Sequence, residues 1–100
     1  MLGFQWIKPQ PDLPTEAVDI ASFVKIGATG LGIGKKLFAS TREAAVAFGY
    51  EWINANIRSD NQSGLRYYSA LGFKDYASIK GYRLSDGRIV DKTLKRFELL

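Results

Sequence analysis

A glycine-rich stretch joins a strand-like segment to a helix-like one, and it constrains the fold more than any other feature of the chain. The stretch is Thr29–Lys36, with glycines at alternate positions. The first N–H groups of a helix have no partner within the helix and lie at the positive end of its dipole. Glycines at such a place leave these groups open to a phosphate. The sequence therefore predicts a strand, a tight turn and a helix that together hold a phosphate-bearing ligand.

Hydrophobic periodicity predicts two helices and five strands around this stretch. Apolar residues recur at helical spacing from about Gly34 to Phe48. A shorter helix begins in the capping sequence 59–63 and ends at Gly72. The remaining apolar runs are predicted strands: Leu2–Ile7, Glu16–Ile26, Trp52–Ile57, Phe73–Tyr82 and Ile89–Leu99. The expected fold is α+β (α/β-like), a mixed sheet with two helices in the order ββαβαββ, forming a single domain over residues 1–100.

The connections predict which strands are neighbours. All three prolines fall in the loop Lys8–Pro14, so a hairpin between the first two strands is expected. The second strand, first helix and third strand form a βαβ unit, which makes its two strands near-parallel neighbours. The turn Ser85-Asp86-Gly87 predicts a hairpin between the last two strands.

Composition narrows the possible chemistry. The 100 residues contain neither histidine nor cysteine, which excludes Ser-His-Asp and Cys-His sites, disulfides and the usual zinc sites. No apolar run approaches the roughly 20 residues of a membrane span, and no signal peptide is recognisable, so we expect a cytoplasmic protein. The net charge of +4 suits an anionic ligand. The basic residues lack interleaved aromatics, so nucleic acid is not the expected partner.

Two common phosphate-binding templates do not fit the glycine-rich stretch. A P-loop requires glycine at the position of Thr29 and serine or threonine at that of Lys36. A Rossmann fingerprint requires a third glycine at the position of Lys35 or Leu37. The sequence therefore supports neither ATP nor NAD as the ligand.

Two segments resemble the motifs of the GNAT superfamily of acetyl-CoA-dependent acyltransferases. Thr29–Gly34 resembles motif A, Gln/Arg-x-x-Gly-x-Gly/Ala. Asn61–Phe73 resembles motif B, Asn-x-x-Ala/Gly-x-x-x-Tyr-x-x-x-Gly-Phe, with Asn61 and Tyr68 in register. Both motifs occur in the right order on the expected elements, and the resemblance covers essentially the whole chain. The resemblance implies acetyl-CoA as the cofactor. A glycine-rich turn taken alone also serves simply to let a strand and a helix approach closely.

The resemblance implies a set of cofactor contacts. In the family, backbone N–H groups of the glycine loop hold the CoA pyrophosphate, and the preceding strand pairs with the pantetheine arm through its backbone. Carried over to this chain, the contacts are Phe23, Val24, Gly30, Leu31, Gly32, Ile33, Gly34 and Lys35. Thr29 departs from the Gln or Arg of the family, and Lys35 or Lys36 is placed to compensate. Asn61 matches an asparagine that contacts the cofactor arm; alternatively, it caps the second helix.

Tyr68 matches the family tyrosine that lies near the CoA sulfur and protonates the leaving thiolate; the alternative is a purely structural aromatic. The general base is not identified. Some family members carry a carboxylate at the position of Asn56, which accepts no proton. Glu16 lies at the far end of its strand, and Asp19 is expected on the opposite face from the site unless a β-bulge shifts the register. Removal of the proton from the acceptor amine would then depend on a water relay or on an amine of low pKa.

The implied activity is transfer of an acetyl group from acetyl-CoA to an amine acceptor of unknown identity. The alternative is a non-catalytic half-domain that binds CoA or only dimerises. By resemblance, a strand, two helices and another strand precede the position of Leu2 in a complete GNAT domain, so we expect the cofactor-binding C-terminal half. The strand Leu2–Ile7 would then be an open edge carrying Phe4 and Trp6, which predicts a homodimer through that edge.

Overall fold

The computed structural model describes residues 3–24 and 31–100. These residues form five strands and two helices in the predicted order, so the α+β class is confirmed. The strands are β1 (Gly3–Lys8), β2 (Ala17–Val24), β3 (Trp52–Arg58), β4 (Lys74–Arg83) and β5 (Ile89–Glu98). The helices are α1 (Leu31–Ala47) and α2 (Gln62–Leu71).

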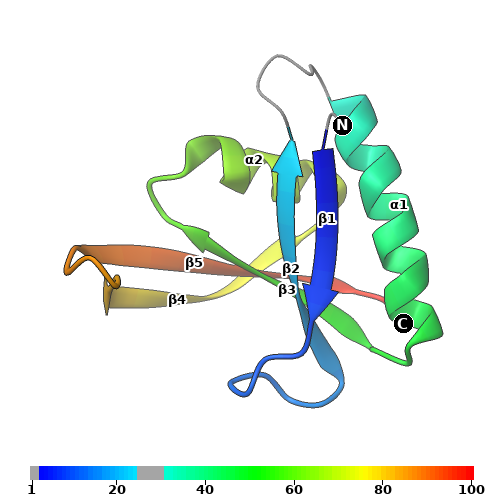
Figure 1. Cartoon of the computed structure of the whole chain (residues 1–100), viewed down its shortest axis with the longest axis horizontal. Helices are drawn as coiled ribbons and strands as arrows, with labels where there is room; N and C mark the ends of the chain where they lie inside the picture. Colours follow the sequence, from blue (N-terminus) through cyan, green and yellow to red (C-terminus); the bar gives the residue numbers. More distant parts are fainter. Residues whose placement is uncertain (1–2, 25–30) are drawn as a thin grey trace.

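The strands form one mixed sheet in the order β1-β2-β3-β5-β4. The predicted neighbours are confirmed: β1 and β2 pair antiparallel, β2 and β3 pair parallel, and β4 and β5 form an antiparallel hairpin. Strand β5 inserts between β3 and β4, pairing antiparallel with each. Figure 1 shows β1 and β2 vertical while the β4–β5 hairpin extends horizontally, as the right-handed twist of a sheet produces.

Helix α1 begins at Leu31, earlier than the start near Gly34 that the periodicity predicts. Gly32 and Gly34 therefore lie within the first turns of the helix rather than in a loop before it. Packing of α1 against β1, β2 and α2 outweighs the low helix propensity of these glycines. For α2, both predicted ends are confirmed. Asn61 is the N-cap, and Gly72 is the C-cap with a left-handed φ of 111°.

Both helices pack on one face of the sheet, where the apolar core lies. The alternate residues Ile53, Ala55 and Ile57 of β3 point to this face and are almost fully buried. They form one cluster with Val18 and Ile20 of β2, Phe38 and Ala45 of α1, Tyr68 of α2, and Phe73. Neither described helix has the length and apolar character needed to cross a membrane.

The opposite face of the sheet carries polar residues and is called the polar face below. Asn54 and Asn56 alternate with the core residues of β3, and Asp19 of β2 pairs in register with Asn54. On β5, Lys92 lies directly opposite Arg58 and therefore on the same face. The sheet thus separates an apolar side covered by helices from a polar side.

Candidate functional site

The parallel pairing of β2 with β3 stops part-way along both strands. It runs over Ala17↔Trp52, Val18↔Ile53 and Asp19↔Asn54, whereas β2 stays paired with β1 as far as Val24. Within the described register, β2 from Ile20 onward therefore has one edge without a partner strand. Phe23 and Val24, predicted to pair with a pantetheine arm, lie on this splayed stretch of backbone.

A cavity of about 500 Å³ occupies the place where β2 and β3 separate. We call it the splay cavity. Its lining residues are Asp19, Ile20, Ala21, Asn56, Ile57, Arg58, Asn61, Gly64, Tyr68 and Lys92. Adjacent residues of one strand, such as Asp19 and Ile20, both line it although they belong to opposite faces of the sheet. The cavity therefore reaches from the helix side to the polar face.

A second cavity, of about 350 Å³, lies on the polar face. It shares Asp19 and Asn56 with the splay cavity. Gln10, Asp12 and Leu13 of the proline-containing β1–β2 loop form one side of it, and Tyr76 and Tyr82 of β4 also line it. The two cavities meet at Asp19 and Asn56, so a ligand in one is next to a ligand in the other.

Tyr68 projects from α2 into the splay cavity and is 8% exposed. Its ring packs edge-on against the rings of Tyr67 and Phe73, each with centroids 5.1 Å away. Such edge-to-face packing holds the ring in one orientation. Tyr68 is thus both a core aromatic and a cavity residue, so the structural and functional interpretations of it are compatible.

Asn61 lies at the edge of the same cavity and caps α2. Its Oδ1 accepts a hydrogen bond from the Gly64 N–H at 3.1 Å and another from the Ser63 hydroxyl at 3.1 Å. The capping alternative for Asn61 is therefore confirmed. Its contact with a cofactor arm stays a prediction, supported by its place beside Tyr68.

The glycine-rich stretch supplies the N-terminal end of α1. Gly30 lies outside the described residues, while Leu31, Gly32, Ile33, Gly34 and Lys35 form the first turns of the helix, and the first turn carries no acidic side chain. An anion bound at this helix end would therefore not be repelled by an acidic side chain of the first turn.

Gly34 has a packing role, of the kind that the alternative interpretation of the glycine-rich turn predicts. A Cβ at Gly34 would overlap ring carbon Cε1 of Tyr67 and lie 3.1 Å from the Tyr67 hydroxyl oxygen. That hydroxyl donates to the Gly34 carbonyl at 3.2 Å and accepts from Gln5 Nε2 at 2.7 Å. Gly34 therefore lets α2 and β1 approach α1, whatever ligand the helix end holds.

Asp19, which the sequence interpretation did not select as a site residue, lines both cavities. The side chain faces the polar side, as strand alternation predicts, but the cavity passes through the splayed sheet and so reaches it. Asn54 Nδ2 donates to Asp19 Oδ1 at 3.0 Å, and the Tyr76 hydroxyl donates to Asn54 Oδ1. Partial burial raises the pKa of Asp19, against smaller lowering effects of its hydrogen bonds. The expected direction of the Asp19 side chain is therefore observed, but the sequence pattern does not show that β2 and β3 separate and leave this side chain at a cavity.

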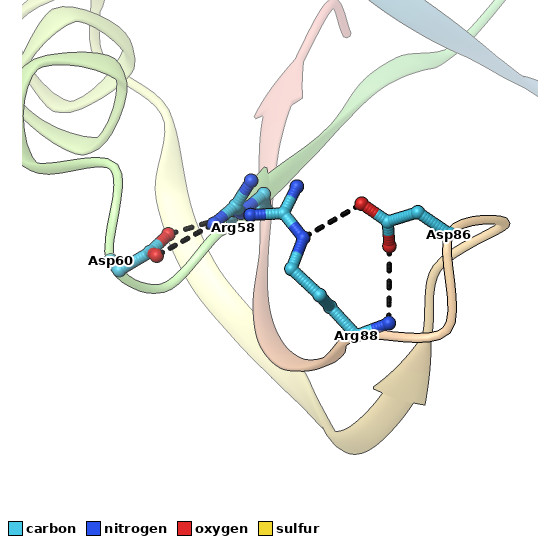
Figure 2. A network of polar contacts seen from close by, with 4 residues as sticks. All are labelled: Arg58, Asp60, Asp86 and Arg88. Carbon is cyan, nitrogen blue, oxygen red and sulfur yellow. Dashed lines mark hydrogen bonds and ion pairs between the residues drawn. The ribbon is translucent and has the colours of Figure 1, made fainter.

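Two further ion pairs lie beside each other, one at the end of β3 and the other at the tip of the β4–β5 hairpin. Arg58 binds Asp60 through two hydrogen bonds, Nε to Oδ1 at 3.1 Å and Nη2 to Oδ2 at 2.8 Å. Beside them, Arg88 Nε donates to Asp86 Oδ2 at 2.8 Å (Figure 2). The hydrogen bond from Arg58 is the main cause of the lowered pKa of Asp60. The guanidinium of Arg58 is therefore engaged with Asp60, although the residue lines the splay cavity.

The chain is similar to known acetyltransferases in sequence and in structure. No family model matches the chain. In sequence it is 34% identical to the mycothiol acetyltransferase of Mycobacteroides abscessus over 73 residues, which cover 73% of this chain and 25% of that protein. In structure it is similar to YncA of Salmonella typhimurium, a candidate acetyltransferase solved with its cofactor acetyl-CoA. That similarity has a TM-score of 0.82 and 25% identity, and it covers 99% of this chain and 58% of YncA.

A GNAT phosphinothricin acetyltransferase from Sinorhizobium meliloti, solved in complex with acetyl-CoA, has the same arrangement of elements. The TM-score is 0.78 with 22% identity, over 97% of this chain and 54% of that one. This chain has the GNAT acetyltransferase fold. The GNAT resemblance predicted from motifs A and B is thereby confirmed for the fold, and the chain spans between a quarter and about 60% of the length of these relatives. Among its described residues, no three potential metal ligands of the Asp and Glu type come together.

Proposed function

We propose that this GNAT-fold chain binds acetyl-CoA and transfers its acetyl group to an amine. The observation that carries the proposal is the splay cavity. It brings the two motif B residues, Asn61 and Tyr68, to the unpaired edge of β2 and to the carboxyl group of Asp19. The acetyl-CoA named for two of the structural neighbours supports the same ligand here.

The residues present fit acetyl-CoA along its length. The unpaired backbone of β2 after Asp19 offers N–H and C=O groups to the amides of the pantetheine arm, in the manner of an added strand. The first turn of α1, without described acidic side chains, suits the pyrophosphate. None of the described glycine-stretch residues lines the splay cavity, as expected where a long ligand has its phosphates and its thioester at separate places.

The chemistry requires one proton acceptor and one proton donor. The amine nitrogen attacks the thioester carbonyl carbon, so a C–N bond forms and the C–S bond breaks. Asp19, held by Asn54 and raised in pKa by burial, takes a proton from the attacking nitrogen. Tyr68 gives its hydroxyl proton to the thiolate, and the phenolate then regains a proton from solvent or from Asp19. The products are an N-acetyl amine and free CoA thiol, and the protein returns to its starting state.

Calorimetric titration with acetyl-CoA tests the ligand. We expect saturable binding by the natural chain and none by Gly32→Glu, because a carboxylate on the first turn of α1 would repel the pyrophosphate. Ala39→Glu, which places the same charge at an exposed position further along α1, is the matched control and should bind normally. Absence of binding by the natural chain would contradict the proposal.

Thiol release across a panel of amines tests the reaction. Turnover supports transfer, whereas acetyl-CoA binding without thiol release from any amine would support the non-catalytic half-domain instead. With an active amine, Tyr68→Phe should lower kcat by roughly 100-fold or more, in the range for loss of a general acid. The acetyl-CoA affinity of Tyr68→Phe should stay near that of the natural chain.

A further inference from the structure

We propose that the acceptor amine carries an anionic group and that Lys92 binds it. The inference rests on the proposed acetyl transfer and names the class of its acceptor: a small molecule with an amine at one end and a carboxylate or phosphonate nearby.

Lys92 is a half-buried cation of the polar face that lines the splay cavity. It lies on β5 opposite Arg58, and its ammonium nitrogen is 4.2 Å from the centroid of the Tyr82 ring. A cation held over an aromatic face keeps its position while its remaining N–H groups stay available. The Tyr82 ring therefore supports the ammonium at the boundary between the two cavities, because Tyr82 itself lines the polar-face cavity.

Lys92 differs from the neighbouring cations in having no carboxylate partner in the part of the chain that the structure describes. Within the described residues Arg58 pairs with Asp60, Lys95 with Asp75 and Arg96 with Glu98, but no described carboxylate forms an ion pair with Lys92. Removing part of the water around an ammonium without supplying a counter-charge is unfavourable. An anionic ligand in the cavity would supply that charge.

Lys92 and Asp19 place side chains of opposite charge at the splay cavity. Both line it together with Tyr68. An amine next to Asp19 is placed to lose its proton to the carboxylate, while an anion on the same molecule reaches Lys92. The adjoining polar-face cavity adds apolar room through Leu13, Ile79 and Leu94, which suits a side chain on the acceptor. The arrangement therefore fits an amino acid or an aminophosphonate better than a simple amine.

Product-like ligands test this independently of turnover. The probes are N-acetyl-leucine, its phosphonate analogue, and N-acetyl-3-methylbutylamine, which lacks the anion; each is titrated calorimetrically into the chain with and without CoA. We expect the natural chain to bind one or both anionic probes about tenfold more tightly than the neutral one. The carboxylate and phosphonate arms show which anion the site prefers.

Substitutions of Lys92 assign the preference. Lys92→Gln should bind all three probes equally, and Lys92→Arg should retain part of the preference. Lys80→Gln, which removes an exposed lysine of β4 outside both cavities, is the matched control and should behave as the natural chain. Thermal unfolding of Lys92→Gln verifies that the fold is intact.

Several results would overturn the inference. They are equal affinity of the natural chain for charged and neutral probes, no binding of any probe, or a preference that survives in Lys92→Gln. A loss of acetyl-CoA affinity in Lys92→Gln would assign the cation to the cofactor instead. The acetyl-CoA titration of the natural chain is a separate measurement, so failure of the proposed function is recognised apart from failure of this inference.

Discussion

Asp19, the proposed proton acceptor, lowers the stability of the fold when it is ionised. Its carboxyl group is half-buried between Asn54 and the β1–β2 loop, where Gln10 Nε2 approaches it at 3.5 Å. Burial raises its pKa above the ordinary value of 3.8. A raised pKa means that the folded state holds the proton more tightly than the unfolded state, so ionisation of Asp19 lowers stability.

The sign of this effect predicts a more stable variant. Below about pH 3.8 Asp19 is protonated in both states and the cost is absent, and it reaches its full size above the raised folded-state pKa. Asp19→Asn removes the charge and should stabilise the chain by up to roughly 1 kcal/mol at pH 7, since solvent screens a half-buried carboxylate. The gain should vanish below about pH 4. Urea unfolding at pH 7 and below about pH 4 measures this gain in stability. Glu51→Gln, at an exposed position, is the control. A gain that persists at low pH would show that ionisation of Asp19 is not its cause.

The same substitution should abolish the proposed proton transfer. Asp19→Asn is expected to lower kcat/KM for an active amine by about 100-fold or more while leaving acetyl-CoA affinity unchanged. In the natural chain kcat/KM should rise with pH as Asp19, whose pKa is raised, becomes ionised. The variant should not show this rise of kcat/KM with pH. Normal turnover by Asp19→Asn would show that the amine loses its proton to water, or reacts in its neutral form, without Asp19.

At the level of elements, the contact between α1 and α2 depends on Gly34. Tyr67 lies against the Gly34 backbone and bonds to Gln5, whose Oε1 in turn accepts from the Thr41 hydroxyl at 2.6 Å. Helix α1, helix α2 and strand β1 therefore meet at one small polar network beside the core. The orientation of the following residue, Tyr68, is tied to this network through the packed Tyr67 and Tyr68 rings.

Gly34→Ala should destabilise the chain by about 1–3 kcal/mol, the usual range for overpacking. The added methyl group would overlap the Tyr67 ring, and the ring is held by hydrogen bonds and aromatic packing. A second substitution, Tyr67→Leu, should recover part of the loss, so the double variant would be less unstable than the sum of the single ones. Chemical denaturation of the four proteins measures the coupling; strictly additive effects would exclude the contact as the cause.

Another element-level contact joins α2 to the β4–β5 hairpin. The Lys95 ammonium, with a side chain 6% exposed, bonds to Ser69 Oγ of α2 at 3.0 Å and to Asp75 of β4. Removing the acid leaves a buried ammonium with one neutral partner, whereas removing the lysine leaves an exposed acid that water solvates.

We therefore expect an asymmetry between the two partners. Asp75→Ala should cost about 2 kcal/mol, below the 3–5 kcal/mol of fully buried pairs because water reaches the place of Asp75. Lys95→Met should be close to neutral, since the replacement fills the same space without a charge. Thermal and urea unfolding distinguish the two, and equal losses would contradict the assigned burial of Lys95.

For the whole molecule, the sheet order leaves β1 at one edge and β4 at the other. Trp6 of β1 is 50% exposed. An edge strand with an exposed aromatic favours pairing with a second copy. The dimer predicted from the sequence stays a prediction, and β1 is the surface on which it depends.

Sedimentation equilibrium tests the dimer. At micromolar concentration the chain should sediment near twice its mass of 11.1 kDa, and Trp6→Lys should shift it toward the monomer. Ile89→Lys, at an exposed apolar position on the β4–β5 hairpin, is the control. A natural chain that sediments as a clean monomer would remove the proposal.

The order of the elements, the motif residues and three of the four strand pairings follow from the sequence, whereas the pairing of β3 with β5 does not. Local rules suffice for these: capping at Asn61 and Gly72, helical spacing along α1, and the turn at Ser85-Asp86-Gly87 depend only on residues close in the chain. The point at which β2 and β3 separate is visible only in the folded chain, because strand pairing is set by packing between residues distant in sequence. That separation brings Asp19 and Lys92, from opposite ends of the chain, into one cavity with Tyr68. The contact of Gly34 with Tyr67, which is distant in sequence, likewise depends on the tertiary structure.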